Sequence, residues 1–204
     1  MSPNGKTGIW LHEPPEWNDD GSKLTFRTKG GVDFWRSTLV DTVADDGHLY
    51  YNEANGDFTA TVRVSGEYRD QYDQAGLFVR QDQNNWLKCG VEHIMGKWAE
   101  RYEYQGSALV VCSGLTTNGW SEWSPLPQLP KNPDYVWMQV VREGKTFFVS
   151  FSLDGAKYDV IKLFALPTAT KVLVGRYATS PAGKGFNVSF DSYLLEQPKL
   201  IQGT

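Results

Sequence analysis

The residues best suited to recognition chemistry lie between Asp70 and Glu92. This segment reads as two strands joined by a polar turn at residues 82–85. Because side chains alternate along a strand, one face of the pair collects polar, charged and aromatic groups. These are Gln74, Phe78 and Arg80 on the first strand and Trp86, Lys88 and Glu92 on the second. Hydrogen-bonding groups beside aromatic rings indicate a face that can bind a ligand.

Two glycines, Gly76 and Gly90, fall on the same face. A missing side chain lets a ligand or a neighbouring group come close to the sheet. A solvated sheet face would also carry oppositely charged pairs across its strands. Two interpretations therefore stay open: a binding groove and an ordinary solvent-facing surface.

Further candidates for the same groove lie elsewhere in the chain. Asp33-Phe34-Trp35-Arg36 places an aromatic ring beside a guanidinium group, and His48 follows a tight turn at residues 45–47. Trp123 belongs to a stretch that is either a rim for a sugar or a hydrophobic plug. The predicted ligand-binding set is Trp35, Arg36, His48, Tyr72, Asp73, Gln74, Arg80, Trp86, Lys88, Glu92 and Trp123.

Signatures of several enzyme classes are missing from the sequence. There is no Gly-x-Ser-x-Gly elbow, phosphate-binding glycine loop, paired-cysteine zinc spacing or His-Glu-x-x-His. The three histidines are scattered, so we expect neither a metal site nor a cofactor. The Glu-x-Asp-x-Glu arrangement of sandwich glycosidases is absent as well. If the protein is an enzyme, the candidates for acid and base are Glu92 with Asp73 or His48.

The elements that must position these residues read as strands throughout. Short runs rich in Val, Phe, Tyr, Trp and Thr alternate with Gly, Asn, Asp or Pro, and helical periodicity is absent. About a dozen strands are expected, including a strand at Trp98–Gln105 and a surface loop at Pro125–Pro133. This number predicts an all-β fold, an antiparallel two-sheet jelly-roll sandwich. We expect one domain over residues 1–204, with its core at about 8–197.

Composition and charge narrow the function further. The net charge is −4 and no basic cluster occurs, which argues against nucleic acid and anionic membranes as partners. Residues 1–7 lack the features of a secretory signal, so a cytoplasmic location is expected. Cys89 and Cys112 lie in strand-like segments and fit buried, reduced thiols. Eight Trp, ten Tyr and ten Phe suit either β-sheet packing or stacking on sugar rings.

Several strings resemble the regulation-of-enolase family, a group of fungal and bacterial proteins. They are Gly-x-Tyr-x-x-x-Tyr-Asp-Gln-Ala-Gly-Leu-x-x-Arg at Gly66–Arg80, Trp-x-Lys-x-Gly-x-Glu at Trp86–Glu92, Asp-Phe-Trp-Arg at Asp33–Arg36 and Asp-Gly-His at Asp46–His48. The resemblance runs from Trp10 to Phe186. It implies a concanavalin A-like fold, a cytoplasmic location and, for fungal members, a link to enolase and to galactose or glucose metabolism.

The resemblance implies no reaction, and this chain departs from it in two places. Met95-Gly96-Lys97-Trp98 stands where bacterial members tend to carry an Asp-Gly turn, and the loop at Leu115–Trp123 is longer. Three hypotheses follow. The first is a non-catalytic, regulatory protein that binds a carbohydrate or sugar-derived molecule in a concave groove. The second is a glycan-active hydrolase or lyase, and the third is an interaction module that acts on a glycolytic enzyme.

Overall fold

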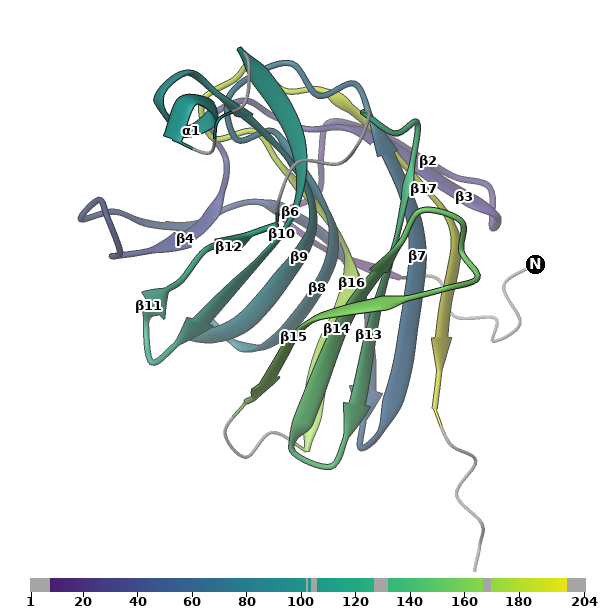
Figure 1. Cartoon of the computed structure of the whole chain (residues 1–204). Coiled ribbons are helices and arrows are strands. Elements are labelled where there is room, and N and C mark those ends of the chain that lie inside the picture. Colours follow the sequence, from purple (N-terminus) through teal and green to yellow (C-terminus); the bar gives the residue numbers. More distant parts are fainter. Residues whose placement is uncertain (1–7, 102, 104–105, 127–131, 167–169, 198–204) are drawn as a thin grey trace, which may run out of the picture.

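Two antiparallel β-sheets packed face to face form the protein (Figure 1). The computed structural model describes residues 8–101, 103, 106–126, 132–166 and 170–197. Strands dominate this part of the chain, and the predicted all-β sandwich is confirmed. Among the residues described, no helix has both the length and the apolar character needed to span a bilayer.

The first sheet has eight strands and contains the polar segment near its centre. Its order is β1 (Ile9–Leu11), β6 (His48–Asn55), β16 (Lys171–Thr179), β8 (Gln74–Asp82), β9 (Asn85–Met95), β10 (Ser107–Thr117) and β11 (Trp120–Ser121), and β12 (Ser124–Pro125) also pairs with β10. Strands β8, β9 and β10 are strongly curved (Figure 1).

The second sheet has seven strands and covers the inner face of the first. Its order is β15 (Asp159–Ala165), β14 (Thr146–Ser152), β13 (Val136–Glu143), β7 (Phe58–Gly66), β17 (Asn187–Glu196), β3 (Lys23–Arg27) and β2 (Glu16–Asp19). A third, two-stranded sheet consists of the hairpin β4 (Phe34–Arg36) and β5 (Val43–Asp45). This hairpin is not paired with a strand of either large sheet (Figure 1).

The main hydrophobic core fills the space between the two large sheets. Alternate residues of β8 and β9 point into it, as the sequence pattern predicts. The two strands contribute Ala75, Leu77, Val79, Leu87, Cys89 and Val91, and the second sheet contributes, among others, Val62, Val64, Met138, Val140, Val149 and Phe190. Both cysteines are buried and free, which confirms that expectation.

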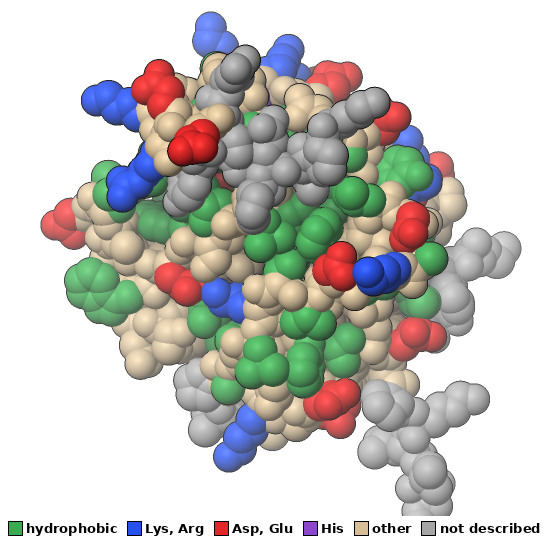
Figure 2. All heavy atoms as spheres, viewed as in Figure 1, with side chains coloured by type: hydrophobic (Ala, Val, Ile, Leu, Met, Phe, Trp, Pro, Cys, Tyr) green, Lys and Arg blue, Asp and Glu red, His purple; other side chains and the backbone are tan. Residues whose placement is uncertain are grey.

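Some side chains at the surface are apolar as well. Figure 2 shows hydrophobic side chains across the middle of the face seen in Figure 1, with many charged side chains toward its edge. Val160 and Leu163 of the edge strand β15 are each 63% exposed. Apolar surface is normal in a folded protein, so the location of polar groups is the more informative feature.

The predicted strand at Trp98–Gln105 is wrong. Residues Gly96–Arg101 form the short helix α1 instead, and residues 102, 104 and 105 lie outside the described part of the chain. A six-residue helix is too short to show a 3.6-residue hydrophobic period, so the sequence pattern could not indicate it. The predicted loop at Pro125–Pro133 lies partly outside the described residues.

Candidate functional site

Strands β8 and β9 bring the polar side chains onto one face, as predicted. Across the pair, Gln74 lies opposite Glu92, and Phe78 lies opposite Lys88. This face is on the outer side of the first sheet, because the alternate residues face the core. The pairing therefore builds a polar and aromatic surface away from the second sheet.

The hairpin β4–β5 is fastened over this surface by two ion pairs. Lys88 Nζ of β9 donates to Asp33 Oδ1 at 3.1 Å and to the carbonyl oxygen of Phe34 at 2.8 Å. Arg80 of β8 binds both carboxylate oxygens of Asp45, at 2.6 and 2.8 Å. Two parallel bonds of this kind fix the geometry of the pair. The two ends of the hairpin are thus each held by a cation of the sheet.

Aromatic packing reinforces this attachment. The centroids of the Phe34 and Phe78 rings are 4.6 Å apart, and those of the Phe78 and Trp86 rings are 5.3 Å apart. Leu49 and Tyr177 complete this buried cluster. The base of the hairpin therefore has a small hydrophobic core of its own.

Between the hairpin and the sheet lies a cavity of about 500 Å³. The sheet supplies its polar floor, and the hairpin, α1 and the segment before β12 supply apolar and aromatic walls. The lining residues are Gly31, Asp33, Trp35, Thr38, Leu39, Val40, Thr42, Ala44, Tyr72, Gln74, Lys88, Glu92, Trp98, Trp123 and Pro181. This volume falls in the range of small-molecule sites.

The hairpin tip leaves apolar side chains in contact with solvent at the cavity. Leu39 is 75% exposed and Val40 is 52% exposed, although both line the cavity. Ser37 and Leu39 adopt positive φ angles of 57° and 69°. Residues other than glycine rarely adopt this conformation, so the tip is a strained turn beside the cavity.

Lys88 is almost fully buried, with 3% of its surface exposed. In addition to its contacts with Asp33 and the Phe34 carbonyl, its Nζ lies 5.7 Å from the centroid of the Trp35 ring and 5.8 Å from that of the Trp86 ring. A buried ammonium group needs such compensation, because losing its water is costly. The two hydrogen bonds described use two of its three N–H donors, which leaves one for a molecule in the cavity.

Glu92 is equally buried, and its carboxyl group accepts two hydrogen bonds. Its Oε2 accepts a hydrogen bond from Trp123 Nε1 at 3.0 Å and another from Cys112 Sγ at 3.1 Å. Loss of water raises the pKa of this carboxyl, while the charge of Lys88 and the two hydrogen bonds act in the opposite direction. The neutral, protonated form of Glu92 is therefore favoured relative to an exposed glutamate.

Replacement of Glu92 by glutamine is expected to flatten the dependence of stability on pH. A carboxyl whose pKa is raised on folding holds its proton more tightly in the native state, so wild-type stability falls as pH rises from about 4.3 through the folded-state pKa. Each pKa unit of the shift corresponds to about 1.4 kcal/mol. Thermal unfolding between pH 4 and 8 should show Glu92→Gln gaining stability relative to the wild type with rising pH.

The control for this experiment is Glu143→Gln, at an exposed glutamate outside the cavity. It should keep the wild-type pH profile. Parallel profiles for wild type and Glu92→Gln would show that Glu92 has the same pKa in both states, against the description above.

Gln74 and Tyr72 complete the polar part of the cavity. Gln74 Nε2 donates to the carbonyl oxygen of Tyr72 at 3.3 Å, and its Oε1 accepts from the Tyr177 hydroxyl at 3.4 Å. Tyr72 has a positive φ of 67°, and burial raises the pKa of its hydroxyl. The Gln74 amide is thus oriented by its neighbours before any ligand binds.

Six of the eleven predicted residues line this cavity: Trp35, Tyr72, Gln74, Lys88, Glu92 and Trp123. The other five, Arg36, His48, Asp73, Arg80 and Trp86, do not. Arg80 is engaged by Asp45, and Trp86 is 1% exposed within the aromatic cluster under the hairpin. The Arg36 backbone N–H donates to Ser121 Oγ at 2.9 Å, which fastens β4 to β11.

His48 is held inside the fold by hydrogen bonds to backbone groups of residues distant in sequence. Its Nδ1 lies 2.6 Å from the His12 carbonyl oxygen, and its Nε2 accepts the Lys29 N–H at 3.0 Å. These partners require a proton on Nδ1 and none on Nε2, which is the neutral form. Burial also lowers the pKa of the ring. His48 therefore connects chain segments and does not reach the cavity.

Asp73 is fully buried and organises a loop. Its Oδ2 accepts the backbone N–H groups of Arg69 and Asp70, both at 2.9 Å, and its Oδ1 accepts the Ser180 hydroxyl at 2.6 Å. A carboxylate with three such donors ties the loop before β8 to the segment after β16. Of the three candidates for acid and base, Glu92 lines the cavity, whereas Asp73 and His48 do not.

Gly76 and Gly90 allow strands β8 and β9 to approach each other closely. They lie opposite each other in the β8–β9 pair. A Cβ atom on Gly90 would overlap the carbonyl oxygen of Ala75, and one on Gly76 would overlap that of Cys89. The sequence predicts that a ligand or a neighbouring group comes close to the sheet at these glycines. The structure shows a neighbouring group there, the backbone of the paired strand.

One family model matches most of the sequence. Residues 10–198 match the model of a family described as "Protein of unknown function (DUF1349)". The chain belongs to this DUF1349 family. It is also 34% identical, over 191 residues, to "Regulation of enolase protein 1" of Saccharomyces cerevisiae, covering 94% of this chain and 90% of that protein. The resemblance to regulation-of-enolase proteins is thereby confirmed.

Solved structures extend the comparison of this DUF1349 chain. A functionally unknown protein from Saccharomyces cerevisiae superposes with a TM-score of 0.83 at 33% identity, covering 94% of this chain and 97% of that one. The carbohydrate-binding module CBM66 of Bacillus subtilis superposes with a TM-score of 0.56 at 13% identity, with 94% and 97% covered. The GH43 protein BlXynB of Bacillus licheniformis gives 0.62 at 15% identity, with 90% and 35% covered. The last two show a shared fold only.

Several cavity residues of this DUF1349 chain were not in the predicted set. Asp33 belongs to the Asp-Phe-Trp-Arg string, so its motif was a usable signal. Trp98 was assigned to a strand that is in fact α1. The hairpin residues Thr38, Leu39, Val40, Thr42 and Ala44 carry no signal of their own. Their place depends on how the hairpin folds back over the sheet.

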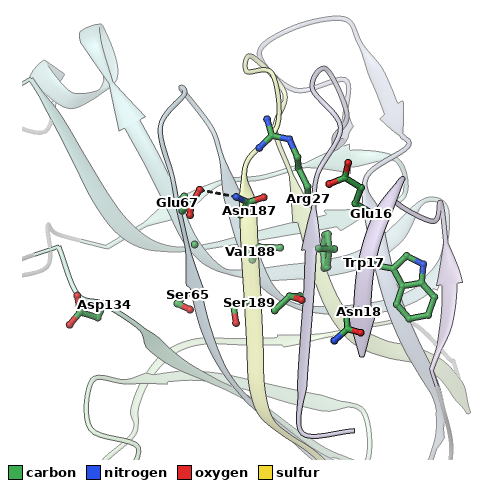
Figure 3. Close-up of a pocket in the computed structure, with 13 residues that line it drawn as sticks. Glu16, Trp17, Asn18, Arg27, Ser65, Glu67, Asp134, Asn187, Val188 and Ser189 are labelled. Carbon is green, nitrogen blue, oxygen red and sulfur yellow. Dashed lines mark hydrogen bonds between the residues drawn. The ribbon is translucent and has the colours of Figure 1, made fainter. Parts of the chain in front are cut away.

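This member of the DUF1349 family has a second hollow, on the outer face of the second sheet (Figure 3). It is a shallow trough of about 650 Å³ across β2, β3, β17 and β7. Figure 3 shows Ser65 and Ser189 at its floor and Asp134 at one end, while the Trp17 ring stands beyond β2. Without an aromatic wall on each side, this trough lacks the combination of features found in the cavity.

Proposed function

We propose that this protein binds a carbohydrate or a sugar-derived molecule in the cavity between β4–β5 and the first sheet, as a non-catalytic step in regulating carbohydrate metabolism. The observation that carries the proposal is the meeting of three indole rings, Trp35, Trp98 and Trp123, with the polar floor of Lys88 and Glu92. Flat rings cover the apolar faces of a sugar, and buried polar groups bind its hydroxyls.

Two other features support the proposed partner and the proposed cellular location. The name of the yeast relative links the family to enolase, so a glycolytic enzyme is part of the proposal as a partner. Two free, buried thiols suit a reducing compartment, which supports a cytoplasmic protein. We further propose that the chain works as one domain, since both large sheets share one core.

Trp35→Ala is expected to weaken sugar binding by about 2 kcal/mol, or roughly thirty-fold in Kd, because it removes a wall of the cavity. The indole is fixed by a 2.7 Å hydrogen bond from its Nε1 to the Thr38 carbonyl oxygen, so little order is lost on binding. Calorimetry with glucose, galactose, xylose and their disaccharides, supported by tryptophan fluorescence, measures the change.

The matched control is Trp120→Ala, since Trp120 is 65% exposed and does not line the cavity. It should bind as the wild type does. If the wild type takes up none of these sugars at millimolar concentration, or if Trp120→Ala weakens binding as much as Trp35→Ala, the cavity is not a sugar site.

An enzyme that acts on glycans is the second candidate, favoured by one observation. Glu92 is a buried carboxyl with a raised pKa that lines a cavity, which is the environment of many general acids. The other carboxylate among the described lining residues is Asp33, which is paired with Lys88. Release of nitrophenol from aryl glycosides would favour this candidate, provided that Glu92→Gln abolishes it.

A further inference from the structure

The charges of the cavity indicate which class of sugar it accepts. Among the described residues, three side chains that carry formal charge line it: Asp33, Lys88 and Glu92. With Glu92 protonated their sum is zero (+1 − 1), and with Glu92 ionised it is −1. Neither state offers an excess of positive charge to an anion.

The single cation of the described lining is already neutralised. Lys88 Nζ lies 3.1 Å from Asp33 Oδ1, and the Lys88 side chain is only 4% exposed. Asp33 is held in place, because its Oδ1 also accepts the Phe34 N–H at 2.7 Å. A phosphate or carboxylate placed on Lys88 would stand beside the Asp33 carboxylate, whose side chain is only 18% exposed, and repulsion between like charges is strong where little water screens it.

The groups that proteins use for bidentate recognition of anions lie elsewhere. No arginine is among the described residues that line the cavity. Arg80 is occupied by Asp45, and the guanidinium of Arg101 lies 5.8 Å from Trp98 without being part of the lining. Arginine is the residue best matched to phosphate and carboxylate geometry. The cavity is therefore poorly equipped for a sugar phosphate or a sugar acid.

Hydroxyl groups, in contrast, match every polar group of the floor. A hydroxyl accepts from the remaining N–H of Lys88 and donates to Asp33 or to the Gln74 oxygen. It can also accept from a protonated Glu92 or donate to an ionised one. We propose that the ligand is an uncharged saccharide and that Asp33 is the residue that rejects anionic sugars. This inference rests on the proposed function of the same cavity.

The test compares neutral and anionic sugars of the same skeleton by calorimetry at pH 7: glucose with glucose 6-phosphate, and galactose with galacturonate. Where a pair binds, the neutral sugar should bind at least about tenfold more tightly than its anionic counterpart. This is the loss of affinity expected for one unfavourable charge contact. An anionic member that binds as well as its neutral counterpart overturns the inference but leaves sugar binding intact. Absence of binding in both pairs, and to xylose and the disaccharides as well, overturns the proposed function itself, and this inference with it.

Asp33→Asn provides the second measurement. Asparagine keeps an oxygen for the Phe34 N–H but removes the negative charge beside Lys88, so the preference should shift at least about tenfold toward the anionic member. Circular dichroism establishes that the variant is folded. The control Asp134→Asn changes an exposed carboxylate in the trough of the second sheet and should keep the wild-type preference. An unchanged preference in folded Asp33→Asn contradicts the role given to Asp33.

Discussion

Gly90→Ala is expected to destabilise the protein by about 3 kcal/mol or more, lowering Tm by roughly 6–12 °C. The added Cβ would overlap the Ala75 carbonyl oxygen and lie 2.8 Å from Gly76 Cα. These are backbone atoms of the paired strand, which cannot rotate away as a side chain can. The strands would have to separate at the centre of the first sheet. Thermal and urea unfolding measure the loss.

Gly114→Ala is the matched control, because Gly114 lies on the adjacent strand β10. Its new Cβ would meet the methylene carbons Cε and Cγ of Lys88 at 3.3 Å, and a shift of a few tenths of an ångström relieves that contact. We expect a cost of at most about 1 kcal/mol there. Equal stabilities for the two alanine variants would show that β8 and β9 are not in such close contact.

Asp73→Ala is expected to cost about 4 kcal/mol, because it leaves three buried donors without their acceptor. Two are the backbone N–H groups of Arg69 and Asp70, and the third is the Ser180 hydroxyl. Tm should fall by roughly 8–16 °C in a chain of this size. Differential scanning calorimetry gives both the shift and the enthalpy.

Ser180→Ala separates the contributions of these donors. It removes one donor to Asp73 and a 3.3 Å acceptor of the Gly185 N–H but leaves the two backbone bonds to Asp73, so its cost should be only about 1–2 kcal/mol. Asp134→Asn, at an exposed carboxylate, should be neutral. A wild-type Tm for Asp73→Ala would mean that its loop does not depend on the carboxylate.

The strand pair at the centre of the site could be predicted because its signals are local. Alternation of apolar residues and the turn at residues 82–85 were enough to place Lys88 and Glu92 on one face, away from Leu87 and Cys89. The observed strands, Gln74–Asp82 and Asn85–Met95, meet at the turn predicted at residues 82–85. Fold class followed from the same signals repeated along the chain.

The composition of the cavity could not be predicted in the same way. Asp33 meets Lys88 across 55 positions of sequence, and only the folded hairpin brings them together. His48 and Asp73 have residue types suited to catalysis, but their partners turn out to be backbone groups and a serine hydroxyl. Residue type indicates what a side chain can do, whereas long-range packing decides which partner it finds.

The independence of the hairpin β4–β5 has an evolutionary consequence. It forms a sheet of its own, and its ion pairs and aromatic base lie at residues 33, 34 and 45. The intervening turn at residues 37–42 supplies cavity wall but no strand to either large sheet. Residues 37–42 can therefore be exchanged or lengthened without disturbing either large sheet, so the shape of the cavity can change on an unchanged scaffold.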